Sequence, residues 1–141
     1  MGFFGKMFGG GPDYPELAPN TEAAARLEAI RGNLEQLARD VSDPMEVVPS
    51  EAGAYVFIGK PPKRFGIAWI EGNEVKSFKT LMEEHGMSGQ EVNKVSDELR
   101  EVYQRHQDAS RFRTKMAERD LVVTPSQDLE HEVRDILARL N

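Results

Sequence analysis

Residues 46–79 hold the pattern that most constrains the fold of this chain, because short apolar runs alternate there with turn residues. The runs are rich in β-branched and aromatic side chains, which favour strands, and they lie at 46–48, 54–58, 65–70 and 75–78. Gly72-Asn73 separates the last two runs and tolerates the positive φ angles of a tight hairpin. The stretch therefore predicts a small antiparallel β-meander of three to four strands.

The segments on both sides of this meander show helical periodicity. Between residues 20 and 41, apolar side chains recur at steps of three and four residues, which places them on one helix face. Because the residue before a proline avoids the α region, this helix is expected to end near Asp40, before Asp43-Pro44. Ser88 and Glu91 have the spacing of a capping box, which predicts that another helix begins at residue 88.

Two further helical segments are predicted in the C-terminal part of the chain. Thr124-Pro125 indicates a helix start, since proline favours the first helical position. Residues 109–118 are also expected to be helical, either as a continuation of the helix from residue 88 or after a restart at Asp108 or Ser110. The predicted fold class is therefore α+β, with the meander packed against four to five α-helices.

The length of the chain and the position of its glycines predict a single folded domain. A chain of 141 residues corresponds to about one domain of ordinary size. Residues 1–19 are rich in Gly, Pro and Phe, which do not sustain helical periodicity. We therefore expect a flexible tail at 1–19, followed by one α+β domain over 20–141.

Large apolar side chains in the predicted tail need a surface that covers them, because a Gly-rich segment cannot bury them by itself. These side chains are Phe3, Phe4, Met7 and Phe8. The surface is a groove of the same chain, a second copy, another protein or a membrane interface. Lys6 is the only cation among them, so a membrane contact would lack the polybasic support that stable anchoring needs. A protein contact is favoured.

A basic loop is the sharpest local feature of the predicted meander. Residues 54–79 carry five Lys or Arg and two Asp or Glu, although the whole chain has a net charge of −6. Lys60, Lys63 and Arg64 surround Pro61-Pro62, and the two prolines restrict the backbone that presents the three cations. The loop is predicted to bind an anion or a partner, or else to protect sheet edges from pairing.

Residues 80–98 resemble the turn of helix-turn-helix DNA readers. A short helix, a turn at Gly86, a capping Ser88 and the apolar Val92 follow one another at the spacing of that motif. This resemblance implies a nucleic-acid-binding regulator as an alternative function. The carboxylates of the second helix, Glu91 among them, oppose the phosphates that such a helix must approach, so nucleic acid is the less favoured partner.

The segment Arg111–Arg119 interleaves cations with apolar side chains and is expected to form a helix. In that helix, Phe112 and Met116 would share one face. Single-stranded nucleic-acid binders combine cations with aromatic rings in this way. The more ordinary interpretation is that the two apolar side chains belong to the core, with the cations extending around them.

Catalytic chemistry has little support in the sequence. The chain has no cysteine, which excludes thiolate metal sites and Cys nucleophiles, and His85, His106 and His131 lie on separate predicted elements. Pairs of carboxylates are numerous, but their spacing relative to Lys and Arg describes solvated helix faces. We therefore predict no catalytic residue, no metal and no cofactor, and keep an enzyme with an unrecognised carboxylate site as a further alternative.

These patterns together favour a non-enzymatic cytoplasmic protein-interaction or regulatory module. Its partner would be another protein or a second copy of the chain, contacted through the apolar tail and the basic hairpin loop. The absence of cysteine fits a reducing cytoplasm. The sequence indicates no small-molecule ligand.

Overall fold

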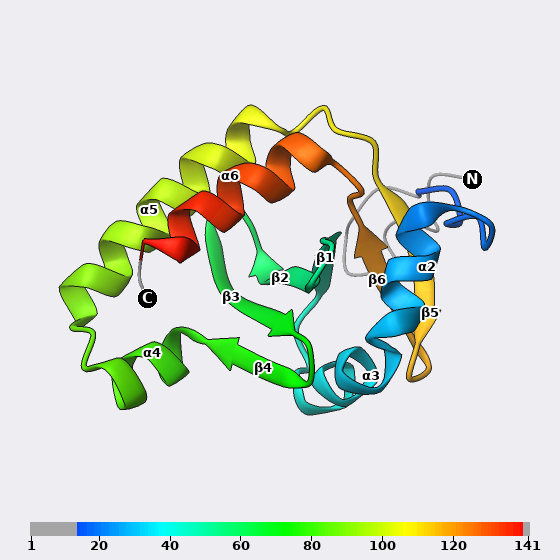
Figure 1. The fold of residues 1–141 in the computed structure, drawn as a ribbon. Helices are drawn as coiled ribbons and strands as arrows, with labels where there is room; N and C mark the ends of the chain where they lie inside the picture. Colours follow the sequence, from blue (N-terminus) through cyan, green and yellow to red (C-terminus); the bar gives the residue numbers. More distant parts are fainter. Residues whose placement is uncertain (1–13, 140–141) are drawn as a thin grey trace.

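The computed structural model describes residues 14–139, whose arrangement is shown in Figure 1. This range forms five helices and one six-stranded sheet. In chain order the elements are α2 (Glu22–Ala29), α3 (Arg31–Asp40), β1 (Met45–Pro49), β2 (Gly53–Lys60), β3 (Arg64–Glu71), β4 (Glu74–Ser77), α4 (Phe78–His85), α5 (Gly89–Arg105), β5 (Phe112–Met116), β6 (Arg119–Val123) and α6 (Gln127–Ala138). The predicted α+β class is confirmed.

The predicted meander is present as β1–β4, in which each strand pairs antiparallel with the next. The sheet continues beyond β1, because β6 pairs with β1 in parallel and β5 pairs antiparallel with β6. The strand order is β4-β3-β2-β1-β6-β5. The sheet is therefore mixed, and it contains two strands that the sequence patterns did not indicate.

Helices cover both faces of this sheet (Figure 1). Leu99 of α5 and Leu129 of α6 belong to a buried cluster with Trp69 of β3. Leu34 of α3 belongs to a second cluster, which includes Ile70 from the opposite side of β3. Neighbouring residues of β3 thus point to opposite faces of the sheet, and burial on both faces explains why β1 is buried along its whole length.

The capping box of α5 is confirmed. The Ser88 hydroxyl accepts a hydrogen bond from the Glu91 backbone N–H at 3.2 Å, and the Glu91 carboxylate accepts one from the Ser88 N–H at 3.1 Å. α6 begins two residues later than predicted, because Ser126 is its N-cap and accepts from the Leu129 N–H at 3.2 Å. Thr124 is instead fully buried.

The first predicted helix is interrupted at Ile30, which separates α2 from α3. Ile30 has φ −118° and ψ 19°, outside the helical region, while its side chain is only 7% exposed. Gly32 lies two residues later and lowers the helix propensity of this stretch, which makes an interruption less costly. The break still leaves Leu27 and Leu34 buried in the same core.

The prediction of a helix over residues 109–118 is wrong. α5 ends at Arg105, and residues 112–123 form the β5–β6 hairpin. Phe112, Thr114 and Met116 are two residues apart, so in a strand their side chains lie on one face, and this spacing also fits β5. Ala117 and Glu118 form the two-residue turn with φ angles of 52° and 65°, a conformation that sequence patterns rarely assign to these residue types.

The turn supplies a test of this hairpin. Glu118→Gly is expected to raise the free energy of unfolding by about 0.5–1 kcal/mol, because glycine adopts positive φ without the steric penalty of a Cβ atom. Glu118→Ala removes the same side chain without that relief and is the control. If residue 118 lay in a helix, Glu118→Gly would instead have a free energy of unfolding about 1 kcal/mol lower than that of Glu118→Ala. Urea denaturation of the two variants therefore distinguishes a hairpin turn from a helix by the sign of the difference.

Candidate functional site

The predicted basic loop connects β2 to β3, with Lys60 paired to Arg64 across its base. The Lys63 N–H donates to the Lys60 carbonyl at 3.1 Å and closes the loop. Gly59, just before it, has a φ of 114°, and a Cβ at this position would lie 2.8 Å from the Arg64 carbonyl oxygen. Glycine is therefore required where the two strands approach each other at the base of the loop.

Arg100 of α5 holds this loop in place. Its Nε donates to the Pro62 carbonyl at 2.7 Å, and its guanidinium lies 5.8 Å from the centre of the Phe65 ring. Asp97 accepts from the same guanidinium at 2.6 Å and orients it. The basic loop is therefore fixed beside the middle of α5.

A pocket of about 350 Å³ lies at the base of the loop, and we call it the hairpin pocket. Ile58 and Phe65 supply its apolar walls, and Lys60 and Arg64 line it as cations. Lys63 is exposed but does not line the pocket. Within residues 14–139, the side chains of Lys60, Lys63 and Arg64 form no ion pair, so two of the three predicted site residues meet at one pocket with their charges available.

The predicted tail contacts Phe3, Phe4, Met7 and Phe8 lie outside the described residues. The chain becomes described at Tyr14, and Pro15–Leu17 runs along the free edge of β5. The Arg113 N–H donates to the Pro15 carbonyl at 2.8 Å, and the Leu17 N–H donates to the Arg113 carbonyl at 2.8 Å. Residues 15–17, which belong to the predicted tail of 1–19, are thus attached to the edge of the sheet.

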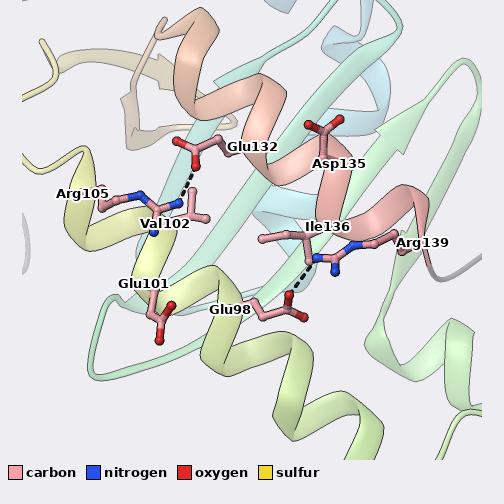
Figure 2. A pocket seen from close by; sticks show the side chains of 8 residues that line it. All are labelled: Glu98, Glu101, Val102, Arg105, Glu132, Asp135, Ile136 and Arg139. Atoms are coloured by element: carbon pink, nitrogen blue, oxygen red, sulfur yellow. Dashed lines mark hydrogen bonds and ion pairs between the residues drawn. The ribbon is translucent and has the colours of Figure 1, made fainter.

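Carboxylates gather in a second place, a groove of about 240 Å³ between α5 and α6 (Figure 2). Glu98 accepts from Arg139 at 2.7 Å across the groove, and Glu132 accepts from Arg105. Asp135 lies on the α6 side. The groove combines acidic side chains with two arginines that already neutralise part of their charge.

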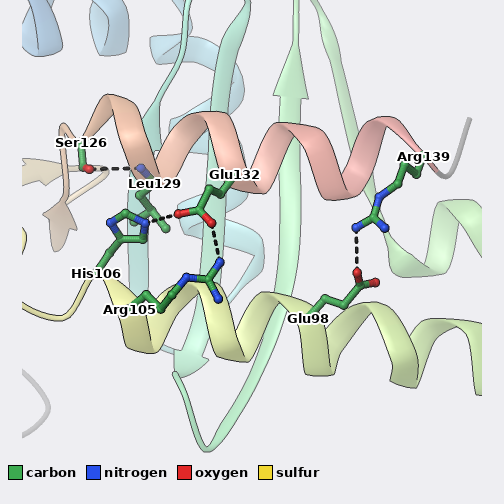
Figure 3. A network of polar contacts seen from close by, with 7 residues as sticks. All are labelled: Glu98, Arg105, His106, Ser126, Leu129, Glu132 and Arg139. Carbon is green, nitrogen blue, oxygen red and sulfur yellow. Dashed lines mark hydrogen bonds and ion pairs between the residues drawn. The ribbon is translucent and has the colours of Figure 1, made fainter.

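Glu132 is the centre of the polar contacts at one end of this groove (Figure 3). It accepts hydrogen bonds from His106 Nε2 and from Arg105, both on the α5 side. The hydrogen bond from His106, followed by that from Arg105, lowers the pKa of Glu132 below its ordinary value. A general acid needs a raised pKa, so Glu132 is suited to linking the two helices rather than to donating a proton.

A buried polar cluster that no sequence pattern had indicated surrounds Glu46 of β1. Glu46 accepts from the Tyr103 hydroxyl at 2.7 Å, from Arg111 Nε at 3.0 Å and from the Thr124 hydroxyl at 2.5 Å. Burial, followed by the nearby Glu46 carboxylate, raises the pKa of the Tyr103 hydroxyl. The sequence feature that could have indicated this cluster is the charged Glu46 inside the otherwise apolar run 45–48, because a buried charge requires partners.

This cluster connects three separate parts of the chain. Arg111 also donates to the Gln107 carbonyl at 2.8 Å and the Ala109 carbonyl at 3.1 Å, and its side chain is only 7% exposed. It therefore fixes the segment between α5 and β5 against β1. The cluster orders the fold, and none of its members faces the hairpin pocket or the α5–α6 groove.

The helix-turn-helix-like segment forms α4, a turn and the start of α5. Gly86 ends α4 with a φ of 68°, and the predicted capping residue Ser88 begins α5. α4 packs mainly against β4 and β3, whereas α5 packs against α6. The exposed side chains in the first half of α5 include Glu91 and Asp97, whose charges oppose phosphate.

The three histidines are separated, as their sequence positions indicated. His85 ends α4, His106 caps α5, and His131 lies on α6, where its Nε2 is 3.5 Å from Glu130 Oε1. Over residues 14–139, no group of three His, Cys, Asp or Glu side chains is placed to hold a metal ion. Nor does any helix in that range have the length and apolar character needed to cross a bilayer.

Comparison with protein-family models, with curated proteins and with solved structures finds no match to this chain. No relative therefore indicates a ligand, a partner or a reaction. The geometry of the hairpin pocket and of its surroundings supplies the basis for a function.

Proposed function

We propose that this protein is a non-enzymatic, cytoplasmic interaction module that binds an acidic segment of a partner protein at the hairpin pocket. The observation that carries the proposal is that Lys60 and Arg64, paired across the base of the loop, line the same pocket as the apolar side chains Ile58 and Phe65. Two cations beside an apolar hollow fit a segment in which a carboxylate adjoins a Leu or Phe side chain. The cations would select and orient the segment, and the apolar contact would retain it.

The way in which the loop is held supports this proposal. Arg100 bonds the Pro62 carbonyl, and Pro61-Pro62 restricts the backbone, so the loop loses little conformational freedom when a partner binds. A basic loop that served only to protect sheet edges from pairing would not need this attachment to α5. Preorganisation of this kind is typical of binding surfaces.

Nucleic acid is the second candidate partner, and one observation favours it. Arg100 places the basic loop beside the middle of α5, so the loop cations lie close to polar side chains of that helix. The exposed face of α5 nevertheless carries Glu91, Asp97 and Glu101, and the chain has a net charge of −6. These charges would repel a phosphate backbone, whereas a peptide with a few carboxylates needs only the hairpin pocket.

The test compares the three loop cations with three exposed cations elsewhere. Simultaneous replacement of Lys60, Lys63 and Arg64 by serine is expected to weaken binding about ten- to a hundredfold, since each exposed ion pair contributes roughly 0.5–1 kcal/mol. The probe is a labelled pool of synthetic peptides that alternate Asp or Glu with Leu or Phe, followed by fluorescence anisotropy. The dependence of affinity on salt should flatten in the same variant.

The matched control replaces Arg39, Lys79 and Lys115 by serine, which changes the net charge equally at exposed positions outside the hairpin pocket. It should bind the peptides as the unaltered protein does. Equal affinities of the loop variant and the unaltered protein would contradict the proposal. Tight binding of a mixed-sequence DNA duplex, with no binding of the peptides, would replace it with the nucleic-acid alternative.

A further inference from the structure

A second pocket lies at the other end of the β2–β3 pair, beneath the last turns of α6, and we call it the Tyr55–Trp69 pocket. Its volume is about 140 Å³, enough for on the order of ten water molecules. Tyr55 and Trp69 are directly opposite one another in the strand register and form two of its walls. Leu137 of α6 adds an apolar wall, and Glu71 and Arg134 add charged groups.

A buried carboxylate, Glu130, faces Arg134, which lines this pocket, although Glu130 itself is not one of the lining residues. The Glu130 side chain is only 6% exposed, and its Oε2 receives no hydrogen bond from any group within residues 14–139. Arg134 Nη1 lies 3.7 Å from Oε2, which is too long for a hydrogen bond, and His131 Nε2 lies 3.5 Å from the other carboxylate oxygen, Oε1. The Arg134 side chain is 49% exposed and lines the pocket, so the cation that faces Glu130 is free to move towards solvent.

Charges around Tyr55 are mostly negative. Burial, followed by the field of Glu130, raises the pKa of Tyr55 to about 12, and Arg134 opposes this effect. Glu71 and Asp135 act in the same direction as Glu130. Even with Lys76 at 3.8 Å from Glu71, the carboxylates outnumber the cations around the pocket. The Tyr55 hydroxyl makes no hydrogen bond with the described residues, while Trp69, which is only 4% exposed, also belongs to the buried cluster on this side of the sheet.

We propose that the Tyr55–Trp69 pocket binds a primary alkylammonium group, which displaces Arg134 and donates a hydrogen bond to Glu130 Oε2. The faces of Tyr and Trp rings attract cations, most strongly where water is excluded. A compact ammonium group approaches a carboxylate more closely than the guanidinium does here, and it carries three donors. The ligand is a free alkylamine or the side chain of a lysine in a partner protein.

The position of this pocket makes the inference independent of the hairpin pocket. In the β2–β3 register, Lys60 and Arg64 mark one end of the strand pair, and Gly53 and Glu71 mark the other. Substitutions in one pocket therefore leave the other intact.

The chain contains a single tryptophan, so the fluorescence and the indole N–H resonance of Trp69 can be followed without a signal from any other indole. Butylammonium and Nα-acetyl-lysine methylamide are the two cationic probes, and 1-pentanol is the neutral control. Both cations are expected to shift the Trp69 signals in a saturable manner, and 1-pentanol is not. Saturation by the lysine derivative at lower concentration than butylammonium identifies a protein lysine as the ligand, and the reverse order identifies a free amine.

Glu130→Gln keeps the shape of the side chain and removes its charge. Butylammonium should bind this variant at least about tenfold more weakly, as expected when a charge-assisted hydrogen bond is lost. Asp128→Asn is the matched control, because Asp128 is exposed on the same helix and its loss changes the net charge equally. Arg134→Gln should bind butylammonium more tightly, because the competing cation is removed.

Three results would overturn the proposal. The first is the absence of any saturable change in the Trp69 resonance with either cation. The second is equal affinity of Glu130→Gln and Asp128→Asn for butylammonium. The third is weaker binding of butylammonium by Arg134→Gln, which would show that Arg134 does not compete with the ammonium group for Glu130.

Discussion

Substitution of Glu46 by alanine is expected to lower the free energy of unfolding by about 3–5 kcal/mol, the range found when one partner of a buried ion pair is removed. The carboxylate accepts from Arg111 and from the hydroxyls of Tyr103 and Thr124. Its loss leaves a guanidinium with a 7% exposed side chain without its counter-charge, and two donors without an acceptor. Urea denaturation followed by Trp69 fluorescence measures the change.

Arg111→Met provides the second arm of this test. Removing both partners should destabilise the protein by less than the sum of the two single substitutions, because neither charge is then left alone. Glu84→Ala, at an exposed position of α4, is the control and should change the free energy of unfolding by less than about 0.5 kcal/mol. A loss of that small size for Glu46→Ala would show that the cluster does not order the fold.

Leu99→Ala and Leu34→Ala are each expected to lower the free energy of unfolding by about 2–5 kcal/mol, the usual range for a leucine removed from a core. Both side chains are fully buried, Leu99 between α5 and the sheet and Leu34 between α3 and the opposite face. Because the sheet separates them, their effects should add to within about 0.5 kcal/mol in the double variant. Chemical denaturation of the three variants tests whether both faces of the sheet are covered.

Met82→Ala is the control for these cavities, since Met82 on α4 is 44% exposed. It should change stability by less than about 0.5 kcal/mol. If Leu34→Ala changed the free energy of unfolding as little as Met82→Ala does, α2 and α3 would not form a core with the sheet. Only the core on the Leu99 side of the sheet would then be supported. If only Leu34→Ala lowered stability, α5 and α6 would not form a core with the sheet.

Several elements were predictable because their signals lie within a few residues of one another. Ser88 and Glu91 satisfy each other's backbone donors three residues apart, so the start of α5 needs no distant contact. The β3–β4 turn at Gly72-Asn73 likewise depends on local backbone freedom, and Gly72 has a φ of 59°. The helix break at Ile30 was not predictable in this way, because both halves keep the same apolar stripe.

The candidate sites also differ in how far local sequence patterns could predict them. The basic loop was found from its own residues, Lys60 to Arg64, but its pocket depends on Phe65 and on Arg100, which is 38 residues from Pro62. The Tyr55–Trp69 pocket requires β2, β3 and α6 together. No local pattern connects Tyr55 with Glu130, and only the packing of α6 on the sheet brings the two side chains near each other.

The sequence by itself determined the meander and the capped start of α5, because strand patterns, turn residues and caps act between near neighbours in the chain. Only the tertiary structure decided that residues 112–123 form a hairpin. Their helical and strand patterns compete locally, and β6 gains its ladder from β1, with Val122 opposite Glu46. Arg111, 65 residues from Glu46, is held by the same long-range contact. Contacts between distant segments outweigh local propensity here, since they bury strands and satisfy charges that no short stretch can satisfy alone.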